Sequence, residues 1–210
     1  MARWNRQDYV GDTVTLARKL VGALLVRRYE GELLVCRITE TEAYVGAVDK
    51  ACHAYQYRKT RRNATMFGPP GHAYLYLIYG MHACLNFVTN PEGEPDAVLL
   101  RGLDVLQGRE TMCRLRYGKN WDELSAYQRK NFLNGPGKCC QALCLNTSSN
   151  GLDLTGDELF ICTKPEDVHL TLPLSDFSIA VGKRIGIDYA EEAADFPWRF
   201  TMVQYSEAKE

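Results

Sequence analysis

The middle of the chain constrains the fold most, because three apolar segments rich in β-branched and aromatic residues follow one another at short intervals. Residues 73–79 and 83–89 flank a Gly-Met-His turn at residues 80–82, and two runs so closely spaced are typical of a β-hairpin. Residues 96–103 form the third run. Strands joined by short connections pair antiparallel. We therefore expect an antiparallel sheet that includes a hairpin.

The rest of the chain mixes helical and strand patterns. Asp12 suits the N-cap of a helix that reaches residue 25, since apolar residues recur there at helical spacing. Residues 33–44 predict a long strand, and in a regular strand Glu40 and Glu42 share one face. The other expected elements are helices at residues 105–115, 123–131 and 136–145, and strands at residues 179–187 and 198–203. We expect an α+β fold with a curved, mainly antiparallel sheet, open and barrel-like, surrounded by helices and carrying a protruding β-hairpin.

Length and composition indicate one folding unit. The chain has 210 residues, of which 46% are hydrophobic, and no Pro/Gly/Ser-rich break divides it. This is enough for one substantial core, so we expect a single domain over residues 1–210. Eight cysteines are scattered among apolar neighbours without paired spacing, and we expect them to be reduced core residues rather than disulfides or zinc ligands.

The sequence also bounds the compartment. No apolar run approaches the length that crosses a bilayer, and the first residues lack the apolar middle of a signal peptide. We expect an intracellular protein without a membrane partner, placed in the cytoplasm or nucleoid of a bacterium or in the nucleus of a eukaryote.

Charge is divided unevenly along the chain. Residues 1–150 carry 20 basic and 14 acidic residues, a net charge of +6, whereas residues 151–210 carry 5 and 12, a net charge of −7. The overall net charge of −1 therefore conceals a basic part that permits an anionic partner.

Glu42 is the main candidate for an ionised base. Its ordinary interpretation is a surface carboxylate, or one paired with an arginine. Arg101 lies at the end of an apolar strand, where an unpaired charge is expensive, so we expect it to pair with a carboxylate. A carboxylate held ionised by an arginine can deprotonate a water, which contributes typically about 10²–10⁴ in rate. Glu40 competes for the same role.

Several aromatic residues lie close to this carboxylate in the sequence. Tyr44, His53 and Tyr76 are each explained alone by packing, but together they are able to enclose a flat aromatic ring, and stacking on such side chains is worth roughly 1–3 kcal/mol per base. Tyr79 stands at the predicted hairpin tip, where it has no core to fill. A side chain there can insert between stacked bases.

A basic loop at residues 58–62 contains Arg58, Lys59, Arg61 and Arg62. It is either a solvated loop or a phosphate contact, and phosphate contacts make affinity fall steeply with salt. Asn86 lies among apolar neighbours, so its amide needs a partner or a purpose if it is buried.

With these residues the sequence resembles the alkyladenine DNA glycosylase family, also called 3-methyladenine or methylpurine DNA glycosylases. The resemblance extends from about residue 16 to residue 203. It rests on separate motifs: Glu-Thr-Glu-Ala-Tyr at 40–44, Met-Phe at 66–67, Tyr-Leu-Tyr-Leu-Ile-Tyr-Gly-Met at 74–81, Val-Leu-Leu-Arg at 98–101, and Gly-Pro-Gly-Lys with Gln-Ala-Leu at 135–143.

The resemblance implies a monofunctional enzyme of base excision repair that flips a damaged purine out of duplex DNA and hydrolyses its N-glycosidic bond. It implies that Glu42 is the general base and that Arg101 helps to hold the attacking water. It also implies that the main-chain carbonyl of Ile185 completes the shell of that water.

The resemblance further implies which residues bind DNA. The residues expected to enclose the flipped base are Tyr44, His53 and Tyr76, with Asn86 excluding guanine through its exocyclic amino group. Tyr79 is expected to fill the gap in the duplex, Met81 to support it, and Arg58 and Arg62 to lie near phosphates. The expected partner is double-stranded DNA containing damaged purines: 3-methyladenine, 7-methylguanine, hypoxanthine or ethenoadenine. We expect a monomer without a cofactor or a metal.

Two other functions remain open from the residues. One is a metal-dependent nuclease in which Glu40, Glu42 and Asp49 hold magnesium. The other is a damaged-DNA or RNA-binding module of the same fold that lacks turnover. The nuclease loses activity in EDTA, and the binding module binds tightly but releases no base.

Overall fold

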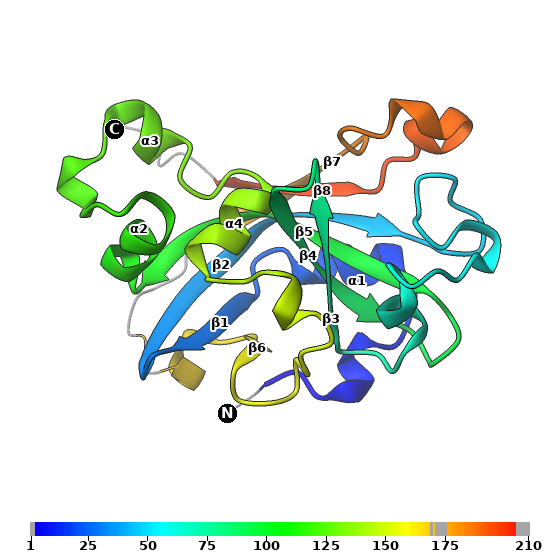
Figure 1. Cartoon of the computed structure of the whole chain (residues 1–210), viewed down its shortest axis with the longest axis horizontal. Helices are drawn as coiled ribbons and strands as arrows, with labels where there is room; N and C mark the ends of the chain where they lie inside the picture. The colour runs from blue at the N-terminus through cyan, green and yellow to red at the C-terminus, as the bar shows by residue number, and fades with distance from the viewer. Residues whose placement is uncertain (1–2, 169, 171–175, 205–210) are drawn as a thin grey trace.

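The fold is organised around one antiparallel sheet of eight strands that does not close into a barrel (Figure 1). We describe it from a computed structural model, over residues 3–168, 170 and 176–204. The strands are β1 Leu24–Tyr29, β2 Glu32–Tyr44, β3 Ala73–Ile78, β4 His82–Thr89, β5 Asp96–Gln107, β6 Leu159–Cys162, β7 Phe177–Gly182 and β8 Arg199–Gln204. Their order is β3-β4-β5-β2-β1-β6, with β8 pairing to β2 and to β7. The expected α+β class and open, curved antiparallel sheet are thus confirmed.

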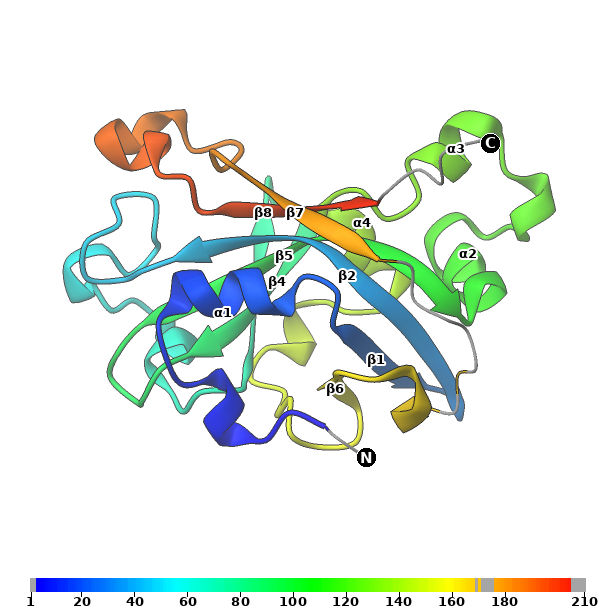
Figure 2. The ribbon, with the colours of Figure 1, turned by 180° about the vertical axis from the view of Figure 1, so that it is seen from behind.

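The described residues form four α-helices, namely α1 Thr13–Leu20, α2 Arg109–Tyr117, α3 Ala126–Lys130 and α4 Pro136–Ala142, and α1, α2 and α4 contact the sheet. Helix α1 covers the face of β2 and β5 that Figure 2 shows in front, and α4 covers β4 and β5 on the face seen in Figure 1. Both helices bury apolar side chains in the main core, including Leu20 and Cys140. Short 3₁₀ segments fill the connections: Arg6–Tyr9, Tyr55–Tyr57, Ala64–Phe67, Trp121–Glu123, Thr147–Ser149, Pro165–Val168 and η7, Asp188–Asp195.

Strand β2 occupies the centre of the sheet. One edge pairs with β5 along most of its length, while the other edge pairs first with β1 and then, at residues 40–42, with β8. The register against β5 shifts on both sides of Glu40, as in a β-bulge. A bulge bends a strand and re-aims its side chains, so the second half of β2 turns away from β1 and toward β8.

The structure corrects several expected element boundaries. The first helix has Asp12 as its N-cap, with Oδ2 accepting from the Thr15 amide at 2.7 Å, but it ends at Leu20 rather than at residue 25. The chain turns at Gly22, whose φ of +93° few other residues adopt, and residues 24–29 form β1, which the sequence analysis missed.

Other expected boundaries are also wrong. Residues 105–107 belong to β5, so the helix expected from residue 105 begins at Arg109. The helix expected at residues 123–131 is the shorter α3, and the one expected at 136–145 ends at Ala142. The strand expected at residues 179–187 is β7, which ends at Gly182.

The eight cysteines are all free, and seven of them are buried. Seven of the eight therefore lie in the core as expected, and Cys144 is the exception. The structure also contains, over its described part, no helix that is both long and apolar enough to cross a membrane.

Candidate active site

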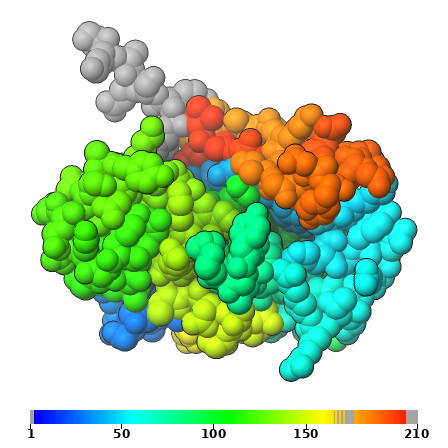
Figure 3. Space-filling view, turned by 45° about the horizontal axis from the view of Figure 1, so that its top comes forward, coloured from blue at the N-terminus to red at the C-terminus, as the bar shows by residue number. Residues whose placement is uncertain are grey.

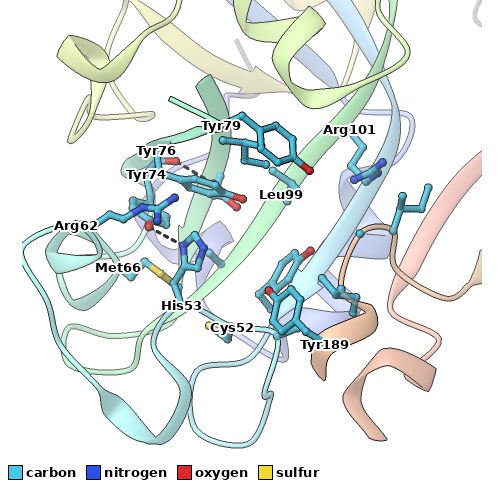
Figure 4. A pocket seen from close by; sticks show the side chains of 18 residues that line it. Cys52, His53, Arg62, Met66, Tyr74, Tyr76, Tyr79, Leu99, Arg101 and Tyr189 are labelled. Carbon is cyan, nitrogen blue, oxygen red and sulfur yellow. Dashed lines mark hydrogen bonds between the residues drawn. The ribbon is translucent and has the colours of Figure 1, made fainter. Parts of the chain in front are cut away.

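A pocket of about 220 Å³ opens beside the β3–β4 hairpin. Its walls come from the end of β2, the loop at residues 46–71, the hairpin, the first half of β5 and the segment that follows β7. Figure 3 shows the hairpin standing on this face next to the orange segment after β7 and the cyan loop after β2. Residues from five distant parts of the sequence therefore meet at one opening, and most of the predicted site residues lie there (Figure 4).

Glu42 lies against this pocket with its side chain fully enclosed. Oε1 accepts a hydrogen bond of 2.8 Å from the main-chain amide of Ile185, and Oε2 accepts one of 2.9 Å from the hydroxyl of Tyr44. The resemblance implied a role for the Ile185 carbonyl, and here it is the amide that contacts the carboxylate. Both carboxylate oxygens are thus held in place by neutral donors.

Arg101 lies between two carboxylates. Its Nε is 3.4 Å from Oε1 of Glu42 and 3.4 Å from Oε1 of Glu40, and its Nη1 is 3.5 Å from Oε2 of Glu42. Arg199 contributes a second guanidinium to Glu40, with Nη1 at 3.1 Å. The expected pairing of Arg101 with a carboxylate is therefore present. These contacts of Arg101 are longer than those of Ile185 and Tyr44, so Arg101 is the more loosely bound neighbour of Glu42.

The environment of Glu42 opposes its ionisation overall. Desolvation raises the pKa of the Glu42 carboxyl above its ordinary value, and the nearby charge of Glu40 adds to this effect. Arg101, the Ile185 amide and the Tyr44 hydroxyl act in the opposite direction, because they stabilise the carboxylate. A carboxyl with a raised pKa is a stronger base than an exposed one once it is ionised.

Aromatic rings form the wall opposite Arg101 (Figure 4). The rings of His53 and Tyr76 meet edge to face with centroids 4.5 Å apart, and those of Tyr74 and Tyr76 are 5.4 Å apart, as expected for residues on one strand face. Since His53 and Tyr76 touch, a flat ligand fits beside this pair rather than between them. Tyr44 lines the same pocket.

The surroundings of His53 favour its neutral form. Its Nδ1 lies 2.9 Å from the hydroxyl of Tyr74. Desolvation, and to a lesser extent the guanidinium of Arg62, lower the pKa of His53 to about 4. An uncharged imidazole does not repel a positively charged ligand.

Asn86 is buried in the pocket wall, and its amide has partners. Its Nδ2 donates to the carbonyl of Tyr74 at 3.1 Å and to that of Cys84 at 3.4 Å. The amide that the sequence placed among apolar residues is thus fixed by main-chain acceptors.

The hairpin tip carries exposed apolar side chains. Tyr79 is 88% exposed and Met81 is 73% exposed. Tyr79 and Gly80 have φ values of +53° and +69° and form the two central residues of the turn, closed by a bond from the Met81 amide to the Ile78 carbonyl. The turn therefore lies one residue earlier than expected. Positive φ is uncommon for tyrosine, and such strain concentrates at functional sites.

The two arginines expected near phosphates are placed differently. Arg62 lines the pocket, where its guanidinium lies 5.2 Å from the Tyr76 ring centroid and donates to the carbonyl of Leu77 at 2.9 Å. Arg58 is exposed on the adjoining loop and does not line the pocket.

The three carboxylates of the nuclease alternative do not converge. Asp49 is fully buried and forms an ion pair with Arg184, whereas Glu40 and Glu42 share Arg101. No cluster of three or more histidine, cysteine, aspartate or glutamate side chains suited to a metal occurs among the residues that the structure describes. The geometry thus does not favour the nuclease interpretation.

The sequence analysis missed three residues at this site. Arg184 is buried beside Tyr44, Arg199 binds Glu40, and Tyr189 lines the pocket while remaining 69% exposed. Arg184 and Arg199 are 141 and 159 residues from their partners, Ala43 and Glu40, so no local pattern could have joined them. The one sequence feature that could have indicated Arg184 and Arg199 is that each stands beside apolar residues.

An aromatic pocket with a buried carboxylate beside it suits a hydrolase that cleaves glycosyl bonds to a flat base. The chain belongs to the methylpurine-DNA glycosylase family, whose sequence model matches residues 7–206. The members of this family are DNA repair enzymes that hydrolyse N-glycosyl bonds. The resemblance seen in the sequence and the enzyme class are therefore confirmed.

Bacterial relatives match the chain over almost its whole length. All three below carry the provisional name 3-methyladenine DNA glycosylase. One from Clostridium perfringens strain 13 is 48% identical over 199 residues, covering 94% of each chain. One from Bacillus cytotoxicus is 50% identical over 192 residues, covering 91% of this chain and 92% of the relative. One from Desulfitobacterium hafniense is 44% identical over 202 residues, covering 96% of each.

Proposed function

We propose that this chain excises alkylated or deaminated purines from duplex DNA by flipping the nucleotide and hydrolysing its N-glycosidic bond. The observation that carries the proposal is the buried carboxylate of Glu42, which receives the Ile185 amide, the Tyr44 hydroxyl and Arg101 beside an aromatic pocket. The name of the relatives supports 3-methyladenine as one substrate. 7-Methylguanine, hypoxanthine and ethenoadenine complete the proposed range.

Flipping begins at the hairpin tip. Tyr79 enters the duplex where the damaged nucleotide leaves, and Met81 supports it, since both side chains are largely exposed on the hairpin turn. Extruding a base costs a few kcal/mol, and least for a damaged or mispaired base. Arg58 and Arg62 bind phosphates beside the opening.

The extruded base enters the pocket and lies against the rings of Tyr44, His53 and Tyr76. A methylated purine such as 7-methylguanine carries positive charge, and a cation over an aromatic face is attracted to it. The neutral state of His53 avoids repulsion with that charge. Asn86 lines the wall and excludes normal guanine through a clash with its exocyclic amino group.

The chemistry needs one water and one base. Glu42 takes a proton from the water, whose oxygen attacks the anomeric carbon of the sugar, and the electron pair of the glycosidic bond leaves with the purine. A cationic purine departs as a neutral base, whereas a neutral purine such as hypoxanthine must also take up a proton as it departs. Ile185 and Tyr44 hold the carboxylate from two sides, so the water approaches from the side of Arg101, whose contacts are the longest. The product is an abasic strand, because water and not an enzyme amine attacks.

The test is single-turnover release of base from a duplex with one hypoxanthine or one ethenoadenine and from methylated DNA, in EDTA, with wild type and Glu42→Gln. We expect wild type to release base. We expect the variant to bind the same DNA but to release base at a rate lower by about 10²–10⁴. Borohydride should trap no enzyme–DNA adduct. Loss of wild-type activity in EDTA would favour the nuclease, and tight binding without release from any of these DNAs would favour the non-catalytic binding module.

A further inference from the structure

A buried ion pair lies next to the two residues that donate hydrogen bonds to the proposed general base. Asp49 and Arg184, hereafter the positioning pair, have side chains with no solvent exposure. Arg184 precedes Ile185 in the chain, and the amide of Ile185 is the 2.8 Å donor to Glu42. A charge pair in the core therefore sits one residue from an atom that contacts the catalytic carboxylate.

Arg184 joins three separate stretches of the chain. Its guanidinium binds Asp49 through both terminal nitrogens, with Nη2 at 2.8 Å from Oδ1. Nη1 also donates to the carbonyl of Ala43 at 2.8 Å, and Nη2 donates to the carbonyl of Ala193 at 3.0 Å. The first of these carbonyls lies in β2 between Glu42 and Tyr44, and the second lies in η7.

The same guanidinium packs on the ring of Tyr44. Its central carbon is 4.7 Å from that ring centroid and 5.1 Å from the ring centroid of Trp198. Tyr44 is the residue whose hydroxyl donates to Glu42 at 2.9 Å. Both neutral donors of the carboxylate, the Tyr44 hydroxyl and the Ile185 amide, thus belong to segments that Arg184 fixes.

Folding stability alone gives a weak reason for such a pair. Moving two charges out of water is costly, and replacing a buried ion pair by apolar residues of similar size is often neutral or stabilising. What apolar residues cannot supply is directional bonding to two carbonyls and a carboxylate at once. We propose that the Asp49–Arg184 pair positions the Tyr44 hydroxyl and the Ile185 amide on Glu42, and so acts on the reaction without touching substrate.

The pair should also influence the protonation of Glu42. The charged and titratable groups facing that carboxylate are Arg101, Glu40, Tyr44, Tyr76 and Arg184 itself. Of the favourable contacts, the bonds from the Ile185 amide and the Tyr44 hydroxyl depend on the pair. Weakening them removes stabilisation of the ionised form, so the acid limb of the rate profile should move to higher pH.

The kinetic test of this proposal rests on the proposed function. A second measurement, hydrogen exchange of the Ile185 amide, does not depend on that function. The variant is Asp49→Leu/Arg184→Met, which removes both charges and leaves neither partner unpaired. We expect the single-turnover rate to fall about 10- to 100-fold, as for a small misplacement of catalytic groups. DNA affinity should stay within about threefold of wild type, and the midpoint of the acid limb should rise. Hydrogen exchange of the Ile185 amide should accelerate relative to wild type.

The matched control is Arg27→Met/Glu158→Leu, which removes an ion pair with a 2.5 Å contact between the buried Arg27 on β1 and Glu158 just before β6, neither of which lines the pocket. It should leave the rate, the acid limb and the Ile185 exchange unchanged. Arg184→Lys keeps the charge but loses the two-nitrogen geometry, and it replaces the double variant if that variant does not fold. We expect it to change the rate, the acid limb and the Ile185 exchange in the same directions but by smaller amounts.

A folded double variant with the wild-type acid limb and the wild-type exchange rate at Ile185 would overturn the positioning role. That role would also be overturned if Arg27→Met/Glu158→Leu shifted both readouts equally, because the effect would then be general destabilisation. If wild type releases no base, the proposed function fails alone, since amide exchange still reports on the positioning pair.

Discussion

Glu40 and Glu42 are chemically identical residues two positions apart, yet they differ in solvent exposure and in hydrogen-bond partners. Glu42 has no solvent exposure and is bonded to the Ile185 amide, whereas the side chain of Glu40 is 19% exposed and shared between Arg101 and Arg199. The bulge at Glu40 accounts for this difference, because it sets the two carboxylates at different depths although both reach Arg101. From the residues alone the two carboxylates remained competitors, and the family resemblance favoured Glu42.

The pH dependence of base release follows from the environment of Glu42. Desolvation raises the pKa of this carboxyl above the usual value near 4.3, and only the ionised form can accept a proton from water. We predict that the single-turnover rate on 7-methylguanine rises about tenfold per pH unit below that pKa and levels off above it. A rate that stays constant down to pH 4 would contradict this assignment.

The raised pKa has a cost for folding that can be given a sign. A carboxyl whose pKa is higher in the folded than in the unfolded state stabilises the fold while it is protonated, and this contribution disappears as pH rises through the folded-state pKa. At pH 7 the ionised Glu42 therefore lowers the free energy of unfolding. The protein retains an unfavourable buried charge where the proposed reaction requires it.

At the scale of elements, the β3–β4 hairpin was the part of the fold best predicted. Its alternating strands and short turn lie close together in the sequence, so local patterns sufficed. Strand β1 was missed because its residues Leu24 and Leu25 continue the apolar spacing of α1, and only the turn at Gly22 separates the two elements. Helix α2 was predicted to start too early because β5 extends to Gln107 through tertiary pairing with β2.

We predict that Tyr79→Asn separates flipping from folding. Asparagine tolerates positive φ, and Tyr79 is 88% exposed. The midpoint temperature of thermal unfolding should therefore be unchanged or slightly higher. The loss of one stacked ring, about 1–3 kcal/mol, should lower the flipping equilibrium by about tenfold or more, measured by the fluorescence of ethenoadenine in a duplex. Tyr127→Asn, which removes a ring 76% exposed on α3, is the control. Equal fluorescence for wild type and Tyr79→Asn would exclude a role of this side chain in flipping.

At the scale of the whole molecule, the sheet brings distant segments together at one opening. Strand β2 supplies Glu42, β5 supplies Arg101, and the segment after β7 supplies the Ile185 amide. The family resemblance indicated all three residues: Glu42 and Arg101 lie in its motifs, whereas Ile185 lies outside them. It could not indicate Arg184 or Tyr189, whose roles depend on how segments more than 100 residues apart pack.

The division of charge between the two parts of the chain leads to a salt-dependence prediction. Removing one cation that binds a phosphate should reduce the slope of log affinity against log salt by about 1. We predict that Arg58→Gln/Arg62→Gln lowers the slope by about 2 and weakens binding to undamaged and damaged duplex alike. Arg28→Gln, exposed on β1, should leave the slope unchanged. The measurement is fluorescence anisotropy over a salt series, and an unaltered slope in the double variant would mean that this loop contacts no phosphate.

The enclosed state of Glu42 has a consequence for fidelity. Because its partners are contributed by the protein alone, the Glu42 carboxylate is already held in place in the absence of DNA. Under the proposed function, a correct base is then not needed to bring this carboxylate into position, so its placement does not discriminate between bases. Under the proposed function, discrimination between damaged and normal bases must therefore depend on which bases the pocket admits and on how readily each base leaves the sugar. Mutations that widen the pocket entrance should thus produce an enzyme that also removes undamaged bases.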